Sequence, residues 1–254
     1  MSIEQTRTKL FEMKLHGMAK GLIEQMSNAH ALSLSFEERF DILVDHEQTY
    51  RENRRLQALL RAAKLSQKAR LEDLRFDSGR NLDRAVIASL SSCQWVDKGF
   101  HLIITGPTGT GKTYLANALG FQGCVKGRSV QFHKLALLLD DLEQAKSAGG
   151  YRKRLAQLNR CALLILDDFA IKAKMTALEC EMLLEVLDGR HGERSTIITS
   201  QLPLKDWHQY LQASYPTSAD AILDRALTNP VRFELLGESQ RQHKMPLLDI
   251  LAAT

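Results

Sequence analysis

The chain has 254 residues, of which 44% are hydrophobic and 25% are charged, which excludes a disordered chain and suits one large domain or a large and a small one. The formal net charge of +4 is mildly basic, so nucleic acid is permitted as a partner but not required. The sequence shows no signal peptide and no apolar stretch of about 18 residues, so we expect a cytoplasmic protein without a membrane segment.

The first 50 residues carry the apolar spacing of helices. Between Thr8 and Met26 apolar residues recur three or four positions apart, which predicts one helix. A second helix should begin near Ser35, because Glu38 follows three residues later as in a capping box. We expect the core of a helical bundle to be formed by Phe11, Leu15, Met18, Leu22, Met26, Phe36, Phe40, Leu43 and Val44.

Residues 53–70 form a basic segment that contains no acidic residue. On a helix, four of its basic side chains would fall within roughly 80° of one another, opposite the leucines. A solvated helix face is the ordinary alternative, but such faces mix charges of both signs. We therefore expect this basic segment to contact duplex DNA through Arg54, Arg55, Arg61, Lys64 and Lys68.

A domain junction is predicted near residues 71–95, which are polar and contain glycine. We place the boundary at residue 75, with an all-α domain for DNA binding and assembly over 1–75 and a second domain over 76–254. In the second domain, apolar runs alternate with helical stretches, which predicts an α/β fold with a mainly parallel five-stranded sheet flanked by helices. The expected strands are 101–105, 129–133, 163–167, 195–199 and 231–235.

The stretch GPTGTGKT at 106–113 has the pattern G-x-x-x-x-G-K-T and stands between an expected strand and an expected helix. Its glycines let backbone N–H groups face phosphates, Lys112 reaches the β and γ oxygens, and the Thr113 hydroxyl binds Mg²⁺. The alternative, an ordinary glycine-rich turn, does not account for this context. We expect ATP or GTP to be bound by Gly106, Pro107, Thr108, Gly109, Thr110, Gly111, Lys112, Thr113 and Tyr114.

The apolar run LLIL at 163–166 leads directly into Asp167 and Asp168. Charges at the end of a buried strand are costly unless a cation is near. In a P-loop protein Asp167 would hold Mg²⁺ and Asp168 would polarise the attacking water. Because successive side chains of a strand alternate, the two should point to opposite sides. The alternative for Asp168 is to cap the next turn.

A second basic zone lies between Glu143 and Asp167, where basic residues occur without an acid. The sequence GGYRKR at 149–154 predicts a flexible loop tip whose charges could neutralise DNA phosphates. A solubilising loop is the alternative. The residues that we expect to contact DNA here are Arg152, Lys153 and Arg154.

In their order, GPTGTGKT, LLILDD, STIITSQ, AILDRAL and GESQR make residues 90–245 resemble an AAA+ ATPase. The chain is most similar to the IstB family of insertion-sequence helper ATPases, relatives of DnaC-type helicase loaders. This resemblance extends to the helical N-terminal region. It implies an AAA+ fold with a truncated lid, since only residues 242–254 follow Arg241.

The resemblance also assigns roles near the γ-phosphate. Gln201 stands where the family has a sensor Asn, with Ser200 as the alternative sensor. Arg225 matches an arginine finger offered to the ATP of a neighbouring subunit, although a surface pair with an Asp is possible at this position. Arg241 matches a second sensor. A finger from a neighbour implies that a single subunit has an incomplete site.

The resemblance implies an ATPase that uses Mg²⁺, assembles as a ring or spiral on duplex DNA largely independently of sequence, and recruits or activates a transposase. A DnaC-like replicative helicase loader is the alternative, because it shares every nucleotide motif. A small-molecule P-loop kinase leaves the basic segment unexplained. The four cysteines are widely spaced and indicate neither a zinc site nor a disulfide framework.

Overall fold

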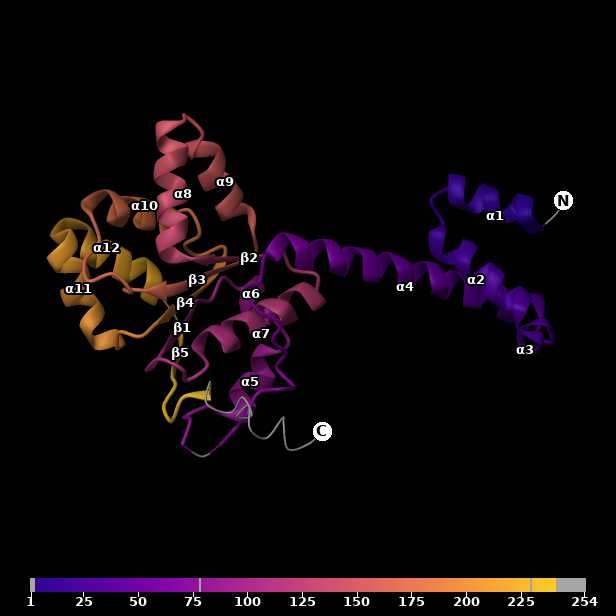
Figure 1. Cartoon of the computed structure of the whole chain (residues 1–254), viewed down its shortest axis with the longest axis horizontal. Helices are drawn as coiled ribbons and strands as arrows, with labels where there is room; N and C mark the ends of the chain where they lie inside the picture. Colours follow the sequence, from indigo (N-terminus) through magenta and orange to yellow (C-terminus); the bar gives the residue numbers. More distant parts are fainter. Residues whose placement is uncertain (1–2, 78, 229, 241–254) are drawn as a thin grey trace, which may run out of the picture. The chain divides into compact units, whose positions relative to one another are not determined.

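The chain folds into two compact units, which the computed structural model describes over residues 3–77, 79–228 and 230–240 (Figure 1). The units are Met1–Ala58 and Leu59–Thr254. They divide inside helix α4 (Phe36–Ala63), whereas the change in composition predicts a boundary at residue 75. The functional division into 1–75 and 76–254 stays a prediction.

The N-terminal unit contains two helices where the spacing predicts one. The helices before α4 are α1 (Ile3–Glu12), α2 (His16–Ser27) and α3 (Ala29–Leu32). The chain breaks between α1 and α2 at Lys14, whose φ is +61°. The reason is a tertiary contact: the Glu47 carboxylate accepts the N–H groups of Gly17 and Met18 at 2.7 and 3.2 Å, at the start of α2. Apolar spacing does not reveal such a cap.

Helix α2 approaches α4 closely at Gly17, where an added Cβ would lie 2.3 Å from the carbonyl oxygen of His46. Burial raises the pKa of Glu47, but the bonds from Arg51 and from the two N–H groups outweigh it and leave the pKa below its usual range. These contacts hold α2 against α4. The start of α4 is as predicted, since Ser35 and Glu38 exchange capping bonds.

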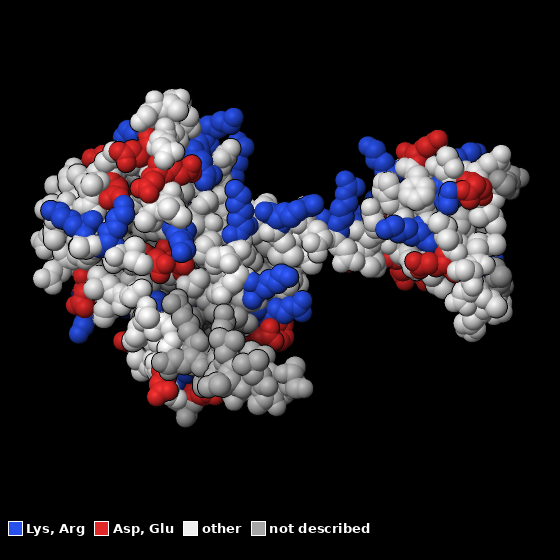
Figure 2. All heavy atoms as spheres, in the orientation of Figure 1, with Lys and Arg blue, Asp and Glu red and all other residues white. Residues whose placement is uncertain are grey.

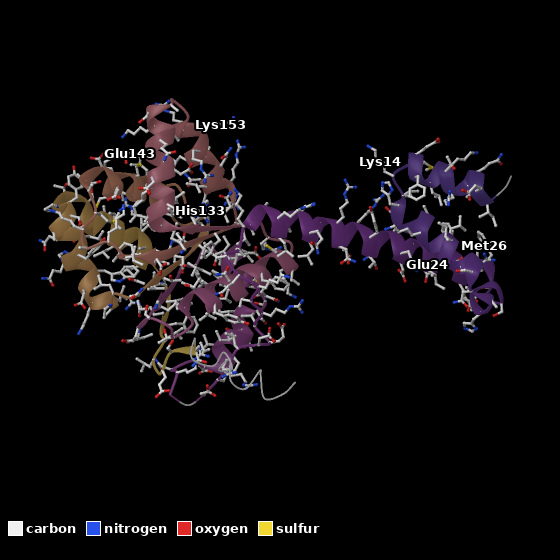
Figure 3. All side chains as sticks on the ribbon, in the orientation of Figure 1. Lys14, Glu24, Met26, His133, Glu143 and Lys153 are labelled. Atoms are coloured by element: carbon white, nitrogen blue, oxygen red, sulfur yellow. The ribbon has the colours of Figure 1, made fainter. Side chains whose placement is uncertain are left out.

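The predicted core of this unit is largely uncovered among the described residues. The exposed fractions of Phe36, Phe40 and Val44 are 76%, 50% and 42%, and Phe11 is exposed as well. Met26, which Figure 3 labels, is also exposed. The other predicted core residues, which are Leu15, Met18, Leu22 and Leu43, are partly buried. The helical spacing therefore marks an apolar face correctly, but the prediction that this face is buried in a bundle is wrong for the single chain.

The second unit is built on a five-stranded sheet of order β2-β3-β4-β1-β5, in which every pair is parallel. The strands are β1 (Leu102–Thr105), β2 (Val130–Lys134), β3 (Leu163–Phe169), β4 (Ser195–Ser200) and β5 (Val231–Glu234). Each lies within two residues of its predicted range. The α/β prediction is confirmed, because buried strands of a parallel sheet give apolar runs that are visible in the sequence.

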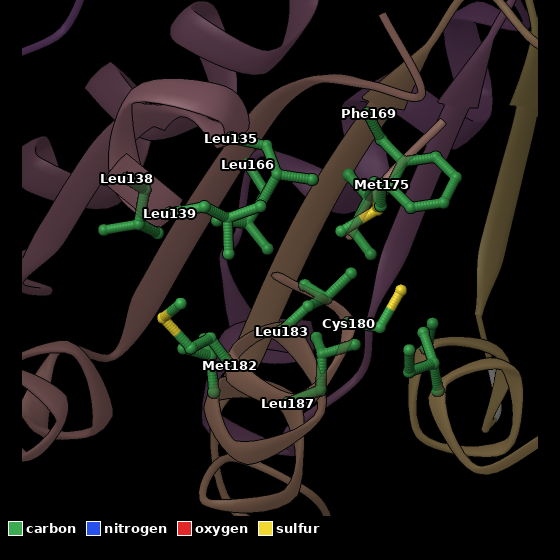
Figure 4. Packing of buried hydrophobic residues seen from close by; sticks show 14 of the residues in the cluster. Leu135, Leu138, Leu139, Leu166, Phe169, Met175, Cys180, Met182, Leu183 and Leu187 are labelled. Atoms are coloured by element: carbon green, nitrogen blue, oxygen red, sulfur yellow. The ribbon is translucent and has the colours of Figure 1, made fainter. Parts of the chain in front are cut away.

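Helices cover both faces of the sheet (Figure 1). They are α5 (Arg84–Leu90), α6 (Gln94–Asp97), α7 (Lys112–Val125), α8 (Leu135–Ser147), α9 (Tyr151–Arg160), α10 (Ala177–Asp188), α11 (Trp207–Ser214) and α12 (Pro216–Leu227), with a short 3₁₀ turn at Leu204–Asp206. On one face Leu166 and Phe169 pack with leucines of α8 and α10 (Figure 4). On the other, Gly120 brings α7 so close that a Cβ would lie 2.8 Å from Ile165 Cδ1.

The predicted loop tip at 149–154 is wrong. The connection after α8 consists of only Ala148, Gly149, with φ +73°, and Gly150, and α9 begins at Tyr151. The residues that follow are good helix formers, and Leu155 and Leu158 pack against the core. Arg152, Lys153 and Arg154 therefore stand on a helix. No helix in the described parts of the chain is long and apolar enough to cross a membrane.

Candidate nucleotide site and basic surface

The phosphate loop connects β1 to α7 and depends on its glycines. Gly106, Gly109 and Gly111 have φ values of +144°, +86° and +95°. A Cβ at Gly106 would also lie 2.2 Å from the carbonyl oxygen of Leu235. Only glycine adopts this backbone without strain. Because α7 begins at Lys112, the first N–H groups of the helix face the loop, as an anion site requires.

Lys112 is only 6% exposed, and its ammonium donates to the carbonyl oxygens of Gly106 and Pro107, both at 2.8 Å. The neighbouring Thr113 hydroxyl donates to an Asp167 oxygen at 2.9 Å. Sequence reasoning placed these groups together, and the structure brings them together at the ends of β1 and β3.

Asp167 is a buried carboxylate, 1% exposed. Burial raises the pKa of Asp167 and the nearby Asp168 charge raises it further, while bonds from Thr199, at 2.6 Å, and Thr113 offset the shift only in part. None of the described salt bridges includes Asp167, although the nearby charge of Lys134 also lowers its pKa. A carboxylate and a hydroxyl side by side are ligands that Mg²⁺ prefers. The donor set therefore fits this ion.

Asp168 has an unusual backbone, with φ +62°. Its N–H donates to the Thr199 hydroxyl at 3.1 Å, and the register of β3 against β4 shifts between Leu166 and Phe169. The shift interrupts the alternation of side chains. Asp168 lines the same cleft as Asp167 and also a small hollow against α8 and α10, so the prediction of opposite sides stays a prediction. None of the described hydrogen bonds uses its carboxylate to cap a turn. Left-handed backbone at a non-glycine residue costs about 1 kcal/mol and often occurs at functional sites.

The cleft has a volume of about 750 Å³ and three walls. The phosphate loop and α7 contribute Thr108, Gly109, Gly111, Lys112, Thr113 and Tyr114, and the strand ends contribute Lys134, Asp167, Asp168 and Gln201. The third wall, which sequence reasoning missed, consists of Ser66, Gln67, Asp73, Leu74, Arg75 and Arg80, joined by Gln240. Of the predicted nucleotide ligands, Gly106, Pro107 and Thr110 shape the loop without lining the cleft.

The predicted sensors differ in position. Gln201 is exposed and lines the cleft, whereas Ser200 is buried and its hydroxyl donates to the carbonyl oxygen of Phe169 at 2.8 Å. The Ser200 hydroxyl is therefore already used in a hydrogen bond within the fold. Arg241 lies outside the described residues. The residue before it, Gln240, donates its N–H to the Gly109 carbonyl oxygen at 2.9 Å.

Arg225 stands on α12 and does not line the cleft of its own chain. It donates to Asp188 at 3.0 Å and to Asp224 at 3.3 Å, so the surface pair that we considered as the alternative is present. A pair of this kind is weak and can exchange partners. The finger role stays a prediction.

The basic segment is not one helix, because α4 ends at Ala63 and Lys64 has a φ of +50°. A tertiary contact accompanies the turn: the Ser66 N–H donates to Asn117 Oδ1 at 2.9 Å. The prediction of a single helical stripe is therefore wrong beyond Ala63. The basic side chains are all exposed nevertheless, and they are Arg54, Arg55, Arg61, Lys64 and Lys68.

The two basic zones come close to each other at His133 of β2. Burial lowers the pKa of His133 to about 4. The charge of Arg154 lowers it further, the charge of Asp141 opposes this, and Lys64 has a smaller lowering effect. Basic side chains gather on the side of α9 that faces away from α8, where Lys153 projects (Figures 2 and 3). Arg154 also pairs with Asp141 at 2.6 Å. We call Lys64, Arg152, Lys153 and Arg154 the basic flank.

Comparison with known proteins decides the family. Residues 8–246 match the family described as IstB-like ATP binding protein. This chain belongs to that family. A Sinorhizobium fredii protein named as an insertion sequence ATP-binding protein is 41% identical over 96% of this chain and 98% of its own length. One from Pseudomonas fluorescens insertion sequence IS1162 is 43% identical over 80% of this IstB-like chain and 88% of its own. The family supports ATP as the ligand of this site.

Solved structures show the fold of this IstB-like chain. A DnaC helicase loader matches with a TM-score of 0.54 and 20% identity, over 68% of this chain and 99% of its own. DnaI matches with a TM-score of 0.56 and 22% identity, over 68% and 91%. DnaA from Aquifex aeolicus, bound to AMPPCP, matches with a TM-score of 0.55 and 17% identity, over 75% and 56%. The predicted AAA+ fold class is thereby confirmed.

Proposed function

We propose that this chain is an ATPase that assembles on duplex DNA and recruits or activates a transposase. The observation that carries the proposal is the family match over residues 8–246, together with a phosphate loop whose Lys112, Thr113 and Asp167 converge. Relatives of similar length are named as insertion sequence ATP-binding proteins, which favours a role in transposition.

For hydrolysis, Thr113 and Asp167 would hold Mg²⁺, which supplies positive charge against the phosphates when bound. Lys112 binds the β and γ oxygens. Asp168 and Gln201 line the same cleft. There Asp168 would orient the attacking water and Gln201 would contact the γ-phosphate. Thr199 bridges the two acids, because its hydroxyl donates to the Asp167 carboxylate and accepts the Asp168 N–H.

Two observations support assembly. Arg225 does not line the cleft of its own chain, so as a finger it would serve a neighbour. The N-terminal unit also exposes an apolar face that includes Phe36, Phe40 and Val44, which a second copy could cover. A triphosphate between subunits then links them and makes assembly depend on ATP. A ring or spiral follows from repeated head-to-tail contacts.

Duplex DNA is proposed as the partner of the basic residues. The basic flank and the exposed arginines of α4 neutralise phosphates without reading bases, so affinity falls steeply with salt. The helicase-loader alternative keeps support from the shared fold of DnaC and DnaI. The family match favours the transposition role over it.

The test is the ATPase rate and sedimentation of the purified chain, with and without long duplex DNA. We expect DNA to raise turnover and to produce larger species in Mg²⁺ and ATP. Lys112→Ala should abolish tight ATP binding and both effects. A helicase loader would respond to a replicative helicase, and a kinase to a small metabolite, while ignoring duplex DNA. A monomer whose turnover ignores DNA contradicts the proposal.

A further inference from the structure

The third wall of the cleft contains a buried guanidinium, that of Arg80, directly against the phosphate loop. Arg80 is 6% exposed. One terminal nitrogen donates to the Thr110 carbonyl oxygen at 2.9 Å, and the other donates to the Arg75 carbonyl oxygen at 2.5 Å. Its own carbonyl oxygen accepts the Leu236 N–H at 3.2 Å. Through these bonds Arg80 connects the phosphate loop to Arg75 in its own segment and to Leu236 after β5.

The charge of Arg80 is not balanced within the described residues. Among the residues that the structure describes, no carboxylate forms an ion pair with it and its buried Nε has no hydrogen-bond partner. A buried cation is costly unless an anion or a full set of acceptors is near. Two carbonyl oxygens supply only part of this. Because Arg80 lines the same cleft as Lys112, an anionic ligand there would supply the missing charge.

The bond to Thr110 also orients the loop. In a trans peptide the C=O and the following N–H point in opposite directions, and the described chain contains no cis peptide. Because the Thr110 carbonyl points toward Arg80, the Gly111 N–H points away from Arg80. A Cβ at Gly111 would lie 2.9 Å from a terminal nitrogen of Arg80, so the guanidinium gives a second reason for glycine at this position.

We propose that Arg80 is a positioning residue for the phosphates of the nucleotide: its guanidinium fixes the peptide between Thr110 and Gly111 and places a positive charge behind the loop. The inference rests on nucleotide binding at the phosphate loop. It gives the third wall, outside the motif, a function in phosphate recognition.

The test is the affinity of Arg80→Lys and Arg80→Ala for ATP, ADP and AMP. Loss of bonds from a charged group predicts at least about tenfold weaker binding of ATP and ADP, with a smaller loss for AMP. Arg80→Lys should retain part of the affinity, because it keeps the charge but not the fork. Millimolar methylguanidinium should restore ATP binding to Arg80→Ala. Unchanged ATP affinity in both variants, or equal losses for all three nucleotides without rescue, overturns the proposal.

Arg190 provides a matched control, because it is also a buried arginine that donates to carbonyl oxygens, those of Leu158 and Ser195, both at 2.6 Å. It does not line the cleft. Arg190→Lys should lower the unfolding temperature and leave the ATP affinity unchanged. If Arg80→Ala fails to fold, Arg80→Lys carries the test alone. Unchanged ATP binding in Lys112→Ala would refute the site itself, a result distinct from failure of Arg80.

Discussion

The two units of this protein differ in how completely they bury their apolar residues. In the second unit the strand residues Leu163, Ile165 and Leu166 are 0% exposed, whereas Phe36 and Phe40 of the N-terminal unit are 76% and 50% exposed. A unit of about 60 residues buries a smaller share of its surface than a larger one. An apolar sequence pattern thus marks a buried core in one unit and an exposed face in the other. That face is where we propose that copies meet.

The largest expected effect lies in the second unit, at the candidate nucleotide site. Asp168→Asn removes the group that orients the attacking water while leaving the loop and Asp167 in place, so kcat should fall about 100-fold or more. ATP affinity should be retained, and assemblies should last longer. Asp140→Asn, an exposed acid on α8, serves as control. Normal turnover in Asp168→Asn would exclude Asp168 from the chemistry.

Two side-chain truncations, one in each unit, test this difference in burial. Leu166→Ala empties a packed core position and should cost about 3 kcal/mol of unfolding free energy. Phe40→Ala removes an exposed ring and should change the stability of the monomer by less than about 0.5 kcal/mol. It should nevertheless weaken self-association, measured by sedimentation at several concentrations. Equal self-association of Phe40→Ala and the unaltered chain would mean that copies do not meet at this face.

The next largest effect is expected when the basic residues are replaced. Replacing Arg54, Arg61, Lys64 and Lys68 together by Ala should weaken duplex binding by more than about tenfold and reduce its salt dependence, by a slope of up to about 0.9 for each lost phosphate contact. The double variant Arg152→Ala and Lys153→Ala tests α9 in the same way. Titration of labelled duplex at several salt concentrations gives both slopes. If neither slope changes, these residues do not contact phosphate.

The smallest effect concerns pH. Burial lowers the pKa of His101 to about 4, and its Nδ1 accepts the Thr196 N–H at 3.2 Å, so the folded unit keeps this ring neutral. The unfolded chain, with a pKa near 6.5, takes up the proton first. Stability is therefore constant well above that value and is lost as the pH falls toward 4, with a loss on the order of 1 kcal/mol at pH 5.5.

The control for this pH dependence uses the contrast between the units. His101→Asn keeps an acceptor without a titrating ring and should flatten the loss in chemical unfolding between pH 7 and 5.5. His30→Asn replaces an exposed ring of the N-terminal unit and should leave the loss unchanged. A pH dependence that survives in His101→Asn would assign it to other groups.

What the sequence predicts well is local. The strands, the phosphate loop and the cap at Ser35 follow from spacing within a few residues, and they lie where expected. Two of the errors involve contacts between distant residues, whereas the helix that begins at Tyr151 was missed although its own residues favour a helix. The Glu47 carboxylate accepts N–H groups at the start of α2, and the turn after Ala63 brings Ser66 to Asn117.

Arg80 was missed for the same reason. It lies in a polar junction with no apolar spacing and no catalytic motif, and only its approach to Thr110 gives it a place in the site. The apolar residues of the N-terminal unit differ again. Their periodicity was visible, but the sequence does not say whether the chain itself or another copy covers them.

The most direct test of the account mixes two inactive variants. Lys112→Ala cannot bind ATP but still offers Arg225, and Arg225→Ala binds ATP but offers no finger. If sites are completed between copies, an equal mixture on duplex DNA should regain hydrolysis, since roughly a quarter of randomly formed interfaces pair an intact loop with an intact finger. A mixture that stays as inactive as either variant alone would contradict the shared site.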